Sequence, residues 1–74
     1  MATVKLAPSP PARRLFGLMV AHADNQLHLS LAESISLSVH LMRAGEDYTA
    51  RSSVTELVAA EWISPSPDGG WLLH

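Results

Sequence analysis

The first run of apolar residues along the chain has the spacing of a helix. Within residues 9–24, SPPARRLFGLMVAHAD, four residues recur at three- and four-residue intervals: Leu15, Leu18, Met19 and His22. That interval places them on one helical face. Ser9 can cap the first turn, and the two prolines that follow it are tolerated there because the first N–H groups of a helix have no intrahelical partner. We therefore expect a first helix that ends near Asp24.

The next segment changes from a helical to an alternating pattern. In NQLHLSL, leucines at positions 27, 29 and 31 alternate with His28 and Ser30. Strict alternation is typical of a half-buried strand. Only about three residues fit between the neighbouring helices, so the predicted strand is very short.

A second helix is predicted directly after this strand. Ser30 and Glu33 form the S-x-x-E pattern of a capping box, in which each residue satisfies a free N–H group of the first turn. Gly45 is a typical C-terminal stop. Between them, one helical face carries an apolar stripe: Leu31, Ile35, Val39 and Met42.

A third helix is predicted from Asp47, which we expect to be its N-cap. One side of this helix carries Ala50, Val54, Leu57, Val58 and Glu61. A second S-x-x-E pattern at Ser53 and Glu56 would allow a later start. We favour the early start because residues 48–52 contain no helix breaker.

The chain closes on a predicted β-hairpin. The sequence Pro67-Asp68-Gly69 favours a turn, because Pro presets φ and Gly permits a positive φ. Trp62 and Trp71 flank this turn, each beside further apolar residues. Such aromatics could stack on nucleobases, but in a hairpin they are more often core or cross-strand partners. A two-stranded ribbon alone is marginally stable, so we expect it to pair with the strand at 27–29, with Trp71 buried.

The predicted order is helix, strand, helix, helix, strand, strand, and it resembles the winged helix-turn-helix fold of small bacterial transcription regulators. The resemblance covers residues 12–74 and is most specific in TARSSVTELVAAEWISPSPDGGWLL. Leu57 and Ile63 match the end of the recognition helix, whereas Glu61 stands where that family usually has Gly. The expected fold class is therefore α+β, a winged helix of three helices and a hairpin. Residues 1–9 would form a mobile N-terminal arm and residues 10–74 the domain.

Two alignments to that family are open. In the first, the recognition helix spans about 47–61 and the wing spans 62–73. In the second, LAESISLS at 31–38 is the helix-turn-helix, which makes Ser38–Ala44 the recognition helix with His40 and Arg43 as its contacts. We favour the first, because the wing of the family directly follows the recognition helix. A weaker likeness, of LMRAGEDYTARSSVTELV, is to the DNA-binding segment of phage terminase small subunits.

The resemblance implies sequence-specific binding of double-stranded DNA by a small transcriptional regulator. Arg can bond guanine bidentately, while Ser, Thr and Tyr can reach bases or phosphates. On the favoured alignment the DNA-binding residues are Arg13, Arg14, Tyr48, Thr49, Arg51, Ser52 and Thr55. The alternative interpretation of the third helix is an ordinary solvated polar face, which every amphipathic helix has.

The charge of the chain argues against tight DNA binding. Its 74 residues include only five Lys and Arg, and the formal net charge is −2. Phosphate neutralisation supplies much of the affinity of most DNA-binding domains, and Glu46 and Asp47 would repel phosphates. A homodimer would double the contacts. The second hypothesis is a winged-helix protein-interaction module that contacts another protein and no DNA.

Several function classes lack any signal in the sequence. There is no cysteine, and the four histidines (His22, His28, His40 and His74) show no metal-binding spacing. No nucleophile elbow, P-loop or dinucleotide fingerprint is present. No apolar run approaches the ~18 residues of a membrane span, and the N-terminus lacks the pattern of a signal peptide. We expect a cytoplasmic protein that is not an enzyme and has no metal, cofactor or membrane partner.

Overall fold

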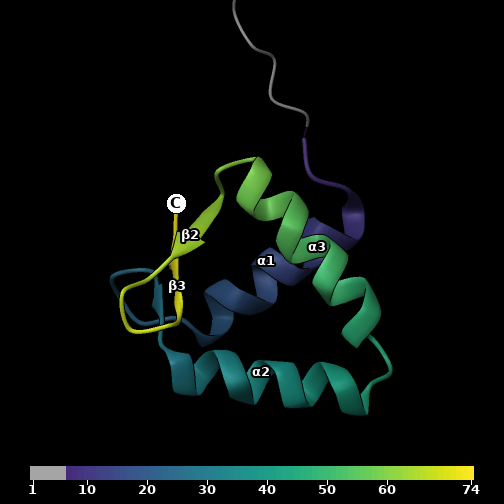
Figure 1. The fold of residues 1–74 in the computed structure, drawn as a ribbon, viewed down its shortest axis with the longest axis horizontal. Coiled ribbons are helices and arrows are strands. Elements are labelled where there is room, and N and C mark those ends of the chain that lie inside the picture. Colours follow the sequence, from purple (N-terminus) through teal and green to yellow (C-terminus); the bar gives the residue numbers. More distant parts are fainter. Residues whose placement is uncertain (1–6) are drawn as a thin grey trace, which may run out of the picture.

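Three helices of equal length and three very short strands follow one another in the predicted order (Figure 1). The computed structural model describes residues 7–74, apart from the side chains of residues 47–49. The elements are α1 (Pro10–His22), β1 (His28–Leu29), α2 (Leu31–Arg43), α3 (Asp47–Ala59), β2 (Ile63–Pro65) and β3 (Trp71–Leu73). The predicted α+β class is confirmed, and the order is consistent with a winged-helix-like topology.

The three strands form one antiparallel sheet in which β3 lies in the centre. Leu29 of β1 pairs with Trp71 of β3, and Ile63 of β2 pairs with Leu73. The N–H of Leu73 also donates to the carbonyl of Leu27 at 2.8 Å, which extends the pairing beyond β1. The hairpin therefore pairs with the short strand before α2, as predicted.

The turn between β2 and β3 has the predicted chemistry. Gly69 has φ 92°, and its N–H donates to the carbonyl of Ser66 at 3.0 Å. The Asp68 carboxylate accepts from the N–H of Gly70 at 2.9 Å. A Cβ on Gly70 would lie 2.0 Å from the carbonyl oxygen of Leu29, so this glycine is required for the hairpin backbone to approach β1.

The N-termini of α1 and α2 are capped in different ways. The Ser30 hydroxyl accepts from the N–H of Glu33 at 3.2 Å, which is the first half of the predicted capping box, but the Glu33 carboxylate makes no hydrogen bond back to the Ser30 N–H. Ser9 is the N-cap of α1, but its hydroxyl and its N–H donate to the Glu56 carboxylate of α3 at 2.8 and 3.0 Å. Pro8 is buried as well, so the packed part of the chain extends two residues into the predicted N-terminal arm.

The end of α2 is the predicted glycine stop. Gly45 has φ 73°, and its N–H donates to the carbonyl of Met42 at 3.0 Å. The N–H of Glu46 donates to the carbonyl of Leu41 at 2.8 Å, which completes a Schellman motif.

α3 ends in the same motif, but without glycine. The N–H groups of Glu61 and Trp62 donate to the carbonyls of Val58 and Leu57, both at 3.0 Å. Glu61 has φ 62°, in the left-handed region that favours glycine. The helix therefore ends at Ala59, two residues before the predicted end at 61. A glutamate thus holds the backbone conformation that glycine usually adopts at the end of a helix.

α3 begins at Asp47, so its N-cap is Glu46 and not the predicted Asp47. The Glu46 side chain makes no capping hydrogen bond, because its carboxylate contacts Arg14 of α1. The N-cap residue of α3 is thus joined to α1 by its side chain.

The core lies between the three helices and the sheet. Its nine buried apolar residues are Ala12, Leu15, Met19, Leu29, Leu37, Leu41, Leu57, Ile63 and Leu73. On α3 the inward side differs from the prediction, since Ser53 is buried whereas Val58 is exposed. Ala50 and Ser53 line the contact with α1, and their small side chains allow the two helices to approach closely.

The predicted apolar stripe of α2 faces outward. Leu31, Ile35, Val39 and Met42 are all exposed, while Leu37 and Leu41 are the buried residues of this helix. An amphipathic helix normally buries its apolar stripe. α2 has apolar residues on both sides, and α1 and α3 contact only one of them.

The two tryptophans are packed against the core but neither is fully buried, which corrects the prediction for Trp71. Trp62 meets Phe16 edge to face, with ring centroids 5.1 Å apart. Trp71 lies at the side of an open cleft described below.

Candidate nucleic-acid interface

The outward side of α3 carries the predicted contact residues. Arg51, Ser52 and Thr55 are exposed on the first turns of this helix. The Thr55 hydroxyl donates to the carbonyl of Arg51 at 3.2 Å, so its oxygen is left to accept from a ligand. The predicted Tyr48 and Thr49 belong to the same helix, but their side chains lie outside the described residues.

Arg14 of α1 forms an ion pair with Glu46, the residue just before α3. Its two terminal nitrogens face the two carboxylate oxygens of Glu46, with the longer contact, Nη2 to Oε2, at 3.4 Å. The hydrogen bond raises the pKa of Arg14 and lowers the pKa of Glu46. The pair therefore neutralises an acid at the edge of the candidate interface, and it also occupies one of the few cations.

The other cations lie on separate surfaces. Arg13 is exposed on α1 and Arg43 is exposed on α2. Arg43 and His40 border a shallow depression on the outer side of α2, together with Ile35 and Val39. The structure does not bring these residues next to Arg51, so the two possible recognition helices present two different surfaces.

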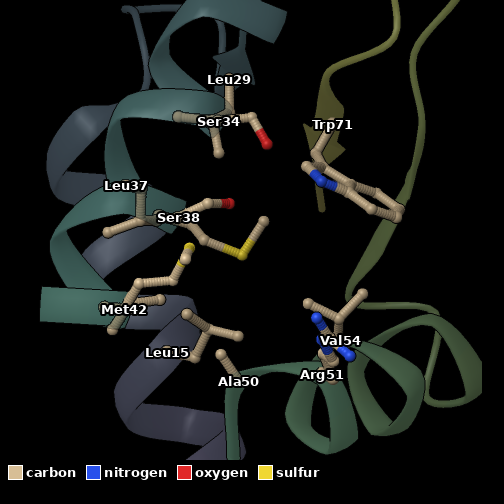
Figure 2. A pocket seen from close by; sticks show the side chains of 12 residues that line it. Leu15, Leu29, Ser34, Leu37, Ser38, Met42, Ala50, Arg51, Val54 and Trp71 are labelled. Carbon is tan, nitrogen blue, oxygen red and sulfur yellow. The ribbon is translucent and has the colours of Figure 1, made fainter. Parts of the chain in front are cut away.

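An open cleft adjoins the candidate interface. It has a volume of about 240 Å³ and lies between α2, α3 and β3, with α1 beneath (Figure 2). Nine of the lining residues are apolar: Leu15, Met19, Leu29, Leu37, Leu41, Met42, Ala50, Val54 and Trp71. The polar ones are Ser34 and Ser38 on the α2 wall and Arg51 on the α3 wall. Arg51 thus belongs both to the cleft and to the outward side of α3.

A polar cluster holds the wing turn against β1. His28 Nε2 lies 3.2 Å from Asp68 Oδ2 and 3.1 Å from the Ser66 hydroxyl, and His28 Nδ1 lies 3.7 Å from Asp24 Oδ2. Hydrogen bonds from the Ser66 hydroxyl, then from the Gly70 N–H and from His28, lower the pKa of Asp68 to about 2. The carboxylate at the wing tip is therefore engaged within the domain.

The described part of the chain offers neither a metal site nor a membrane-spanning helix. No group of three or more His, Asp or Glu side chains there is placed to hold a metal ion. No described helix combines the length and the apolar character that crossing a membrane requires.

Comparison with known proteins adds no family to this picture. No family model, curated protein or solved structure matches the chain. The inference about function therefore depends on the topology and on the residues themselves.

Two features of the site were missed from the sequence. The Arg14–Glu46 pair joins residues 32 positions apart, and no local pattern signals it. The sequence does carry one signal for the cleft, because α2 has more apolar residues than one buried face can hold. The position of the cleft, however, depends on how α2 is placed relative to α3.

Proposed function

We propose that this domain binds double-stranded DNA through the outward side of α3, as a small transcriptional regulator. The observation that carries the proposal is the exposed set of Arg51, Ser52 and Thr55 on the helix that precedes the hairpin. Within the described part of the chain, Arg51 has no ion-pair partner. Its guanidinium is therefore free for a bidentate contact with guanine or for a phosphate.

The hairpin and α1 would flank this contact. Arg13 and Arg14 would lie toward phosphates beside the recognition helix, with Arg14 also screening Glu46. Each neutralised phosphate releases about one counterion, and this release supplies much of the affinity for DNA. Two to three phosphate contacts per copy would therefore give only weak binding. A single copy at a formal charge of −2 would thus bind DNA much less tightly than most regulators do.

The direct test is a titration of a fluorescent random duplex at low salt, read by anisotropy. We expect binding that weakens as salt rises, with a slope of log K against log salt of about −0.9 for each phosphate contacted. Absence of binding at low salt and high protein concentration would contradict the proposal.

A second candidate function is protein binding through the outer side of α2, here defined as Leu31, Ile35 and Val39 with the depression that Ile35 and Val39 border. Ile35 is 55% exposed, which is unusual for the apolar stripe of a helix in a small domain. This observation favours a protein partner, and the partner we propose is a second copy of the chain.

Charge placement supports an antiparallel pairing of two α2 helices. Glu33 lies in the first turn of α2, and His40 and Arg43 lie in its last turn. An antiparallel two-fold arrangement brings the acid of each copy toward the cations of the other, and it also opposes the two helix dipoles. The small residues Ala32 and Ser36 form the floor over which Ile35 of the other copy could pack.

Such a dimer would carry two copies of α3 and would thereby double the DNA contacts. Sedimentation equilibrium across a wide range of protein concentration tests it directly. We expect a concentration-dependent mass between one and two chains, and a single-chain mass at every concentration would rule out self-association.

A further inference from the structure

The cleft between α2, α3 and β3 is open to solvent and has a volume of about 240 Å³. Concave and mostly apolar surfaces with a few polar groups are the usual form of small-molecule sites. Apolar side chains line most of it, and the Trp71 indole forms one side (Figure 2). Filling it with an apolar group would remove these side chains from water.

The polar groups of the cleft favour an anion. Ser34 and Ser38 direct their hydroxyls into the cleft from the α2 wall (Figure 2). Neither hydroxyl, nor the Arg51 guanidinium on the α3 wall, forms a hydrogen bond to another described residue. None of the described residues that line the cleft is acidic. The site therefore offers one positive charge and two hydroxyl groups without an internal counter-charge.

We propose that this cleft binds a small carboxylate with an apolar body. The carboxylate would pair with Arg51, since guanidinium and carboxylate form charge-assisted and often bidentate hydrogen bonds. The body would contact Trp71, Val54 and the leucines beneath. At about 240 Å³ the cleft is slightly smaller than the sites of drug-sized ligands, which indicates a single ring or a short branched chain.

Binding in the cleft would also affect DNA, a consequence that rests on the proposed function. Arg51 cannot pair with a carboxylate in the cleft and with a base or phosphate outside it at the same time. The ligand and DNA would therefore compete for one guanidinium, and the carboxylate would act as an effector that releases DNA. By linkage, DNA would weaken carboxylate binding by the same factor.

The site is tested without DNA, on the full chain, with 4-phenylbutyrate and two probes of the same shape, 4-phenylbutanol and 4-phenylbutylamine. Two-dimensional ¹H–¹⁵N NMR measures the affinity and the location. We expect the carboxylate to bind about tenfold more tightly than the alcohol, the amine to bind most weakly, and the indole N–H of Trp71 to shift.

Two matched variants separate the charge contact from general apolar binding. Arg51→Gln should bring the affinity of the carboxylate down to that of the alcohol. Arg13→Gln, which removes an exposed cation outside the cleft, should leave it unchanged. Both residues are exposed, so neither change should unfold the domain, which the NMR spectrum itself reports.

Three results would overturn the site: equal affinities for the carboxylate and the amine, shifts confined to the outer side of α2, or no shift with any probe at roughly 10 mM. Anisotropy with duplex DNA then tests the competition separately. Carboxylate binding without any DNA binding would overturn the proposed function and leave the site intact. Carboxylate binding that leaves DNA affinity unchanged would overturn only the effector role.

Discussion

α2 and α3 have the same length and both contact α1, yet their outward sides are opposite in character. α3 turns Arg51, Ser52 and Thr55 toward solvent. α2 turns Ile35, Val39 and Met42 toward solvent and still buries two leucines on its other side. The outward side of α3 is mostly polar, although Val58 is exposed, whereas α2 is apolar on both sides.

This difference has a physical meaning. A polar outward side is stable in water and is free to bind a charged ligand, whereas exposing a contiguous apolar side costs free energy that a partner could recover. The inward sides of α2 and α3 also differ. Small residues let α3 lie close against α1, while α2 stands further off and leaves the cleft open. This difference supports our proposal that α3 contacts DNA and α2 contacts protein.

The largest expected effect is on stability, in a comparison of one apolar residue from each of the two helices. Leu57 of α3 is 0% exposed, so Leu57→Ala should lower the free energy of unfolding by about 2–5 kcal/mol. Ile35 of α2 projects into solvent, so Ile35→Ala should change the free energy of unfolding of the monomer by less than about 0.5 kcal/mol. Urea unfolding at low protein concentration measures both. A comparable loss in the two variants would mean that the α2 stripe is packed, contrary to the structure.

The second comparison uses one arginine from each helix and decides between the two possible recognition helices. Arg51→Gln should weaken binding to DNA by about 1–3 kcal/mol if its contact is a bidentate one with a base. Arg43→Gln should have a much smaller effect, because Arg43 lies on the outer side of α2. Fluorescence anisotropy on the same duplex gives both values. Loss only in the Arg43 variant would move the recognition helix to α2.

A third comparison uses two valines that are almost equally exposed, Val39 of α2 at 40% and Val58 of α3 at 39%. If α2 is the dimer contact, Val39→Gln should weaken self-association about tenfold, because a polar amide would be buried without a partner. Val58→Gln should leave self-association unchanged. Sedimentation equilibrium measures this, and equal behaviour of the two variants would remove α2 from the interface.

The smallest expected effect concerns the wing turn, which packs beside Leu31 at the N-terminal end of the outer side of α2. The pKa of Asp68 is lowered to about 2 in the folded domain, from an ordinary value of 3.8. Its carboxylate therefore stabilises the fold fully above about pH 4, and this contribution is lost as the pH falls toward 2. Asp68→Asn should melt slightly below the parent at neutral pH.

The pH dependence supplies the control for this variant. The difference in melting temperature between parent and Asp68→Asn should narrow from pH 4 to pH 2, since the parent carboxyl becomes protonated there. A difference that stays constant across this range would show that the charge of Asp68 does not hold the wing turn.

The sequence by itself determined the elements whose signals are local. The Ser30 cap of the second helix, the Gly45 stop and the Pro67-Asp68-Gly69 turn all act between residues a few positions apart, and each is present in the structure, although Glu33 does not return the second hydrogen bond of a capping box. The order of helices and strands followed from these signals. The pairing of the hairpin with residues 27–29 followed from the need of a short ribbon for a third strand.

Only the tertiary structure decided which side of each element faces inward. α2 has two apolar stripes of similar strength, and its pattern alone could not show that Leu37 and Leu41 are the buried ones. The contacts of Arg14 with Glu46 and of Ser9 with Glu56 span 32 and 47 residues. Such contacts arise from the close packing of α1 against α3, whereas the cleft beside Arg51 depends on how α2 is placed relative to α3. Interactions between distant residues depend on the placement of whole helices, which no local pattern encodes.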